Sequence, residues 1–287
     1  LPITGVRLLS STVRSIDSIL IPRRLIESGL SSSDAVSTFG ILSGMVLPLL
    51  FLPFAFTSAL SMVMIPNLSE DIIHNKWTSV RNKVSKAILI TSLTAFPISA
   101  FLFSLAHPLG MALYQQEEIG RLLMPLSCIA GIHGLQHTLG GILNGLGKQN
   151  RAAIHFLVGG TFQIFCTWIL VAQPHLGIYG YIIGFIANTI FVTTLHFRTV
   201  IYTIKLPVQW TEWFIKPVFA SLVTGSVLRL SYLFLSDRGY GTAFALFFAS
   251  MIGIAVLLLA LYATGSLSQL IEFIYSKNSR ANRRYDT

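Results

Sequence analysis

Apolar residues along this chain are gathered into eight long stretches, separated by short segments that hold most of the charged residues. Each stretch is about 20 residues or longer, which as an α-helix is enough to cross a hydrocarbon core of about 30 Å. The pattern therefore predicts an all-α integral membrane protein with eight transmembrane helices. The stretches cover residues 2–22, 39–65, 87–106, 122–146, 152–172, 177–197, 214–235 and 242–264.

The first stretch carries charges where a membrane helix normally has none, at Arg7, Arg14 and Asp17. With serines at positions 10, 11 and 18, these residues recur at i, i+3, i+4, i+7, i+10 and i+11, which places them on one stripe of a helix. Ionisable side chains at membrane depth are costly, and they usually face a water-filled cavity or each other. The stripe therefore indicates a polar interior and favours transport as the function.

Arginine is well suited to an anionic head group, because its guanidinium fork binds phosphate through two hydrogen bonds. Arg23 and Arg24 extend the positive charge just beyond Pro22. We therefore expect a substrate path lined by Arg7, Arg14, Asp17, Arg23 and Arg24. Two other interpretations stay open: Arg7 snorkels to the membrane surface, and Arg14 and Asp17 form a structural ion pair.

The fourth stretch carries a second polar group, in which His133, Gln136 and His137 lie on one helical face. Two histidines four residues apart can chelate zinc, but the sequence shows no third ligand nearby. We predict a polar patch that packs between helices or lines the cavity, with Gln136 and His137 as further candidates for contact with substrate. No metal and no cofactor are expected.

Proline makes the second stretch irregular. Its 27 residues would form a helix of about 40 Å, which is longer than the bilayer is thick. Pro48 and Pro53 lie inside it and predict a kink. Kinked or broken helices in transporters often flank the substrate route.

Three pairs of glycines four residues apart predict surfaces where helices pack closely. They are Gly40 and Gly44, Gly141 and Gly145, and Gly180 and Gly184.

The longest internal loop covers residues 66–86. Within it Trp77, Val80 and Val84 fall on one helical face, which Ile88 continues. This spacing predicts an interfacial helix that leads into the third stretch.

The composition agrees with a membrane protein. Hydrophobic residues make up 53% of the 287 residues and charged residues 11%, whereas a soluble domain carries about 25% charged residues. The first stretch lacks the initiator Met and basic region of a signal peptide, and a chain that begins at Leu1 suggests a fragment. Cys128 and Cys166 lie within apolar stretches and form no disulfide framework.

The net charge of +9 is unevenly distributed. Thirteen of the 20 lysines and arginines fall in the C-terminal tail or in the loops that follow the second, fourth and sixth stretches. Four fall in the other loops, and three lie within stretches. By the positive-inside rule, both termini of the chain are then cytoplasmic. Anionic membrane lipids explain the basic side, so we expect membrane lipids and no nucleic acid as partners.

No motif predicts an enzyme. The segment 141–148 superficially resembles a phosphate-binding loop, but Ile142 stands where the first glycine is required and Gln149 replaces the Ser or Thr. The sequence also offers no plausible nucleophile–base pair or acidic dyad.

Five short segments carry a resemblance to a known family. They read RSIDSILIPRRL at 14–25, FGILSGM at 39–45, PLLFLP at 48–53, IPNLSE at 65–70 and GILNGLGK at 141–148. Together they resemble the stage V sporulation protein B and polysaccharide flippase family of the multidrug/oligosaccharidyl-lipid/polysaccharide exporter superfamily. Members usually have Gln in place of Asn144. The resemblance covers about residues 1–265.

The resemblance implies a 14-helix transporter of the bacterial cytoplasmic membrane, built from two six-helix lobes and two extra helices. This chain would then resemble the C-terminal six-helix lobe of a MATE-like flippase in residues 1–200 and the two additional helices in 201–265, with a basic cytoplasmic tail in 266–287. The missing N-terminal lobe becomes an expected partner. Alternating access needs one lobe to rock against the other, and this chain would hold only one lobe. The fragment is therefore expected to be inactive alone.

The implied substrate is an undecaprenyl-pyrophosphate-linked saccharide, a lipid II-type peptidoglycan precursor for the spore cortex. Two alternatives stay open. A drug or cation antiporter of the same superfamily would favour more membrane carboxylates than Asp17. A non-transporting membrane scaffold for cell-envelope assembly would not need the charged stripe.

Overall fold

The computed structural model describes residues 2–52 and 54–266, and it leaves out the side chains of residues 2–11, 14, 54–56, 60, 61 and 63. Within the described residues every regular element is helical. The elements are α1 (Pro2–Glu27), α2 (Ser32–Ile41), the π-helical η1 (Leu42–Val46), α3 (Leu47–Leu50), α4 (Phe54–Ile73), α5 (Trp77–Ser104), α6 (Ala106–Tyr114), α7 (Glu117–Gly145), α8 (Gln149–Leu170), α9 (Ile178–Ile204), the π-helical η2 (Thr211–Ile215), α10 (Lys216–Asp237) and α11 (Thr242–Ala263).

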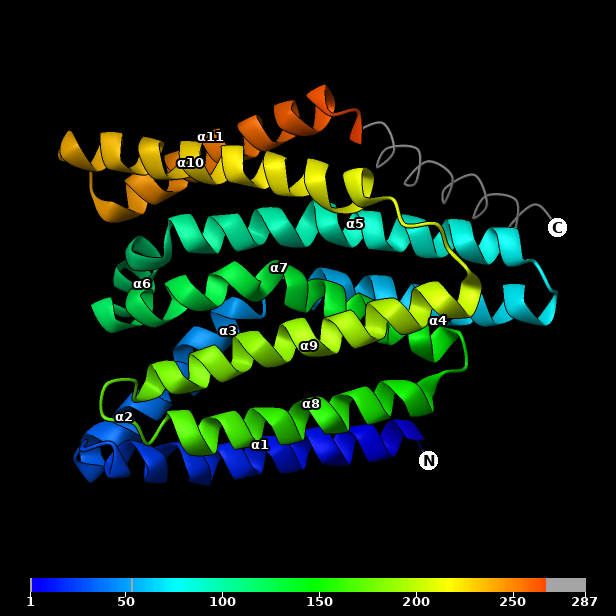
Figure 1. The fold of residues 1–287 in the computed structure, drawn as a ribbon. Coiled ribbons are helices and arrows are strands. Elements are labelled where there is room, and N and C mark those ends of the chain that lie inside the picture. Colours follow the sequence, from blue (N-terminus) through cyan, green and yellow to red (C-terminus); the bar gives the residue numbers. More distant parts are fainter. Residues whose placement is uncertain (1, 53, 267–287) are drawn as a thin grey trace, which may run out of the picture.

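The long helices run side by side between two ends of the molecule (Figure 1). One end holds the start of α1, the α4–α5 and α7–α8 turns and the end of α9, and these turns carry Lys76, Lys148 and Lys205. The opposite end holds the α1–α2, α8–α9 and α10–α11 connections, with Arg238 in the last of them. The grouping of the loops expected from the charge pattern is therefore seen, whereas the cytoplasmic side stays a prediction.

Six segments of the described chain are long and apolar enough to cross a membrane. They are Ser32–Leu50, Trp77–Ser104, Gln149–Leu170, Ile178–Ile204, Thr211–Asp237 and Thr242–Ala263. The helices α1, α4 and α7 are outside this group, because charged or polar residues lower their hydropathy. The multi-pass, all-helical class is thus confirmed, while eight transmembrane helices and a MATE-like arrangement stay predictions.

The second predicted helix, residues 39–65, is broken rather than kinked. Helix α3 ends at Leu50, a turn occupies Phe51 and Leu52, and α4 begins at Phe54. Pro53 explains the break in physical terms, because proline disfavours helical geometry in the residue before it and has no N–H to donate. The two pieces continue across the molecule from one end to the other (Figure 1).

The helix predicted in residues 66–86 is present from Trp77 and leads into the third stretch as the start of α5, but its apolar face is not interfacial. Helix α4 continues to Ile73, α5 begins at Trp77, and only a three-residue turn joins them. Val80 and Val84 are fully buried in the core, so their apolar face packs against protein.

The turn between α4 and α5 is fixed by a partly buried ion pair. Lys83 Nζ lies 2.6 Å from Asp71 Oδ2 and donates a hydrogen bond of 3.2 Å to the carbonyl of Asn67. Burial of Asp71 opposes its ionisation, but hydrogen bonds from Lys83 and Ser79 and the charges of Lys83 and Lys76 outweigh this and lower the pKa of Asp71. The pair therefore holds the end of α4 on α5.

Two apolar cores lie at the two ends of the molecule. One contains Ile21 and Leu25 of α1 with α2, α3 and the first half of α7. The other contains Leu68 of α4 with α5, the second half of α7 and the end of α9. Helix α7 contributes residues up to Ala130 to the first core and residues from Leu135 to the second. The break between α3 and α4 likewise separates residues of the first core from residues of the second.

The glycine pairs behave differently from one another. A Cβ on Gly180 would lie 2.5 Å from the backbone carbon of Leu170, and one on Gly184 would lie 2.8 Å from Cβ of Cys166, so α8 and α9 pack closely there as predicted. A Cβ on Gly145 would lie 3.3 Å from Cα of Ile65. Close packing at Gly40 and Gly44 is wrong, because no described atom lies within 4 Å of the Cβ position there.

Candidate functional site

His133 lies where the two cores meet. Its ring stacks on Phe51 at 5.5 Å between centroids and meets Phe185 of α9 at 5.4 Å. Its Nδ1 is 3.2 Å from Oε1 of Gln136, so the imidazole donates to the amide oxygen in the matching tautomer. The ring thereby connects the break after α3 with α7 and α9.

Other polar groups continue this region between the cores. Gln136 and His137 are half-buried on α7, and the hydroxyls of Thr138 and Thr91 are 2.8 Å apart and buried. We refer to His133, Gln136, His137, Thr138 and Thr91 as the polar layer. The structure therefore brings the predicted residues Gln136 and His137 together beside a helix break, where a transporter would place a substrate route.

Asp17 lies on α1 and is half-buried. Its Oδ1 is buried and accepts no hydrogen bond from a described residue. It lies near Tyr181 of α9, whose ring stacks on Phe185 at 6.2 Å. Phe185 also contacts His133, so the segment of α9 that carries Tyr181 and Phe185 lies between Asp17 and the polar layer.

The side chains of Arg7 and Arg14 lie outside the described residues, although both positions belong to α1. Pairing of Arg14 with Asp17 therefore stays a prediction. Helix α1 packs mainly against α8 and α2 and has only slight contact with α9, whereas α7 packs extensively against α9.

Arg23 and Arg24 point in different directions from this region. Arg24 donates from Nε to the carbonyl of Trp168 at 2.8 Å, lies 5.2 Å from the Trp168 ring and pairs with Glu27. The side chain of Arg23 is 79% exposed and lies 3.8 Å from Glu27. Arg24 thus ties the end of α1 to the end of α8, and the structure does not bring either arginine to the polar layer.

The sequence analysis missed a polar seam between α8 and α9. His155 and His196 lie with their Nδ1 atoms 3.0 Å apart, and both amide atoms of the buried Gln163 lack a hydrogen-bond partner among the described residues. His155, Gly159 and Gln163 are spaced by four residues, which places them on one face of α8. This spacing is the signal that could have found the seam.

The described residues contain no group of three or more His, Cys, Asp or Glu side chains arranged to hold a metal ion. Their polar groups can instead hydrogen-bond to a polar ligand or to water within the membrane. Such donors and acceptors can bind a polar group.

Comparisons with known proteins agree with this interpretation. The family model of lipid II flippase MurJ matches residues 25–120. Sporulation protein YkvU of Bacillus subtilis is 25% identical over 211 residues, which are 74% of this chain and 47% of that protein. Stage V sporulation protein B of the same organism is 24% identical over 213 residues, which are 74% of this chain and 41% of that protein.

The chain is thus similar, over parts of its length, to the lipid II flippase family model and to stage V sporulation protein B. No solved structure matches it. The chain spans less than half of the length of the curated relatives that it matches. The segment that matches the flippase model begins at Leu25, so the charged stripe of α1 precedes it. With six segments that are long and apolar enough to span a membrane, and with this similarity to a flippase family model, the chain is a multi-pass membrane protein.

Proposed function

We propose that this chain is one lobe of a membrane transporter that flips an undecaprenyl-pyrophosphate-linked saccharide. The matched family model is that of a lipid II flippase, and both curated relatives are named as sporulation proteins. These names support a lipid II-type precursor of the spore cortex as the substrate. The match covers less than half of each relative, so the rest of the transporter would be an N-terminal lobe in the unmatched part.

The observation that carries the proposal is the charged stripe of α1. Asp17 has a buried, unpartnered oxygen among the described residues, and Arg7 and Arg14 lie on the same stripe of the helix. Charges at this depth are costly and mark ion or substrate pathways. Arginine is the residue best matched to a pyrophosphate, because its planar fork binds two oxygens at once.

The polar layer would continue the path for the saccharide. Its histidines, amide and hydroxyls offer both donors and acceptors, which sugar hydroxyls require. The prenyl tail would stay in lipid, where its burial needs no protein groups. Flipping requires only that inward-facing and outward-facing states bind the head group with different affinity.

The proposal is tested by substrate binding to the full chain in lipid nanodiscs. The ligand is an undecaprenyl-pyrophosphate-linked disaccharide, and binding is measured for Arg14→Gln and Asp17→Asn beside the unchanged protein. Loss of one phosphate-binding arginine is expected to weaken binding about tenfold, which corresponds to about 1.4 kcal/mol.

The matched control is Arg121→Gln. Arg121 is an exposed arginine that lies 3.1 Å from Glu117 at the end opposite the start of α1, and its loss should leave the affinity unchanged. Equal affinity of Arg14→Gln and the unchanged protein would overturn the role of the stripe. An equal loss in Arg121→Gln would show that only net charge matters.

A further inference from the structure

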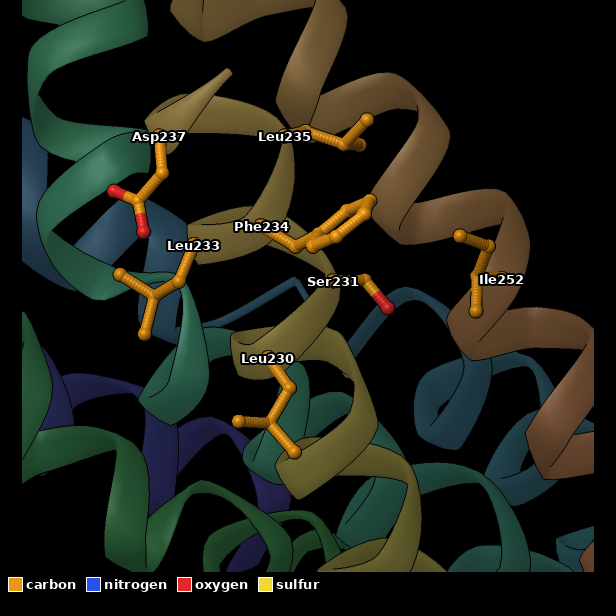
Figure 2. A pocket seen from close by; sticks show the side chains of 7 residues that line it. All are labelled: Leu230, Ser231, Leu233, Phe234, Leu235, Asp237 and Ile252. Carbon is orange, nitrogen blue, oxygen red and sulfur yellow. The ribbon is translucent and has the colours of Figure 1, made fainter.

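A groove of about 600 Å³ lies between α10 and α11, near the connection that joins them (Figure 2). Its volume is within the range of 300–1,000 Å³ that ligand pockets have. Helix α10 packs against α5 and α11, so the groove is separate from the polar layer on α7. The residues that line it are Leu230, Ser231, Leu233, Phe234, Leu235, Asp237 and Ile252.

Most of the groove is apolar and open to the outside. The exposed fractions of Leu230, Phe234 and Ile252 are 66%, 56% and 42%. Both helices are long and apolar enough to span a membrane, and α10 ends at Asp237. Leu230 is seven residues deeper, about 10 Å along a helix, so the groove runs from the membrane boundary into the hydrocarbon.

The mouth of the groove carries one charge of each sign. Asp237 is exposed at the last position of α10 and forms no hydrogen bond or ion pair with a described residue. The guanidinium carbon of Arg238 lies 4.2 Å from the centroid of the Phe234 ring, which forms part of the wall. The two charges stay apart, and a ligand with opposite charges at its own ends would satisfy both.

We propose that this groove binds a zwitterionic phospholipid with a primary ammonium head group, such as phosphatidylethanolamine. One acyl chain lies along Leu230 and Phe234, where it replaces exposed apolar surface. The lipid phosphate meets Arg238, and the ammonium donates hydrogen bonds to the carboxylate of Asp237. A quaternary ammonium has no N–H to donate, and an anionic head group meets the repulsion of Asp237, so both bind less well.

The test uses the full chain in nanodiscs that contain equal amounts of phosphatidylethanolamine and phosphatidylglycerol. Lipids that stay bound are counted by native mass spectrometry. We expect phosphatidylethanolamine to be enriched about fivefold, the ratio that one partly exposed ion pair supplies. Asp237→Asn should abolish this enrichment, and Arg238→Gln should lower retention of both lipids.

Two controls keep the outcome unambiguous. Glu118→Gln removes an exposed carboxylate from the first turn of α7, away from the groove, and should keep the enrichment. Leu233→Trp fills the groove without removing a charged residue and should lower retention of both lipids. Equal binding of the two lipids by the unchanged protein, or enrichment that survives Asp237→Asn, would overturn the proposal. Displacement of the bound lipid by undecaprenyl phosphate would also overturn it.

Discussion

At the scale of single residues, Arg24 and Asp17 show how two charges on one helix take different roles. Arg24 meets the carbonyl and ring of Trp168 and the carboxylate of Glu27, so its charge is satisfied by protein. Asp17 keeps a buried oxygen without a described partner. A satisfied charge stabilises the fold, whereas an unsatisfied one is available to a ligand.

Replacing Arg24 tests this difference. Arg24→Ala removes a hydrogen bond from a charged group and a cation–π contact, so it should lower the free energy of unfolding by about 1–2 kcal/mol. Arg23→Ala is the matched control, because a surface ion pair contributes less than about 1 kcal/mol. Thermal unfolding in detergent measures both variants. A midpoint for Arg24→Ala equal to that of Arg23→Ala would contradict the structural role.

At the scale of elements, the antiparallel pair α8 and α9 depends on glycines that no larger residue can replace. The backbone of Leu170 and Val171 lies within 2.7 Å of the Cβ position on Gly180, so neither helix can yield by a side-chain movement. The same pair holds the His155–His196 contact and the buried Gln163. Close packing of these two helices therefore positions the polar seam.

Gly180→Ala should destabilise the protein by about 1–3 kcal/mol, because overpacking forces the backbones apart. Gly40→Ala provides the opposite case within the same protein. No described atom lies within 4 Å of its Cβ position, and alanine favours a helix by about 1 kcal/mol over glycine. Unfolding midpoints measured under one condition should move in opposite directions. A stabilising effect of Gly180→Ala would show that the helices are further apart than described.

The positions of the long helices followed from the apolar runs, since hydropathy alone reports which segments prefer lipid. The prolines of the second stretch predict a kink, but proline content does not show whether the helix continues, so the break at Phe51 is not predicted. The His155–His196 contact joins residues 41 positions apart, and sequence spacing carries no information on which helices become neighbours. For the same reason, the glycine spacing does not show whether another helix packs against Gly40.

At the scale of the whole molecule, the chain has two apolar cores joined by a polar layer and a broken helix. Under the proposed function, this lobe would rock as a body against a second lobe during alternating access. Asp17 of α1 lies near Tyr181 of α9, and Phe185, one turn further along α9, meets His133 of the polar layer. The proposed function therefore requires that Asp17, this segment of α9 and the polar layer contact the head group of the substrate.

Complementation of a sporulating strain that lacks the full-length relative tests this claim most directly. The strain would receive this chain alone, the chain together with an N-terminal lobe, or the same pair carrying Arg14→Ala. Heat-resistant spores are counted, and the amount of each chain in the membrane is measured by immunoblot. The account predicts rescue only when both lobes are present, and loss of rescue with Arg14→Ala at equal expression. Rescue by this chain alone, indifferent to Arg14→Ala, would contradict the account and favour a membrane scaffold.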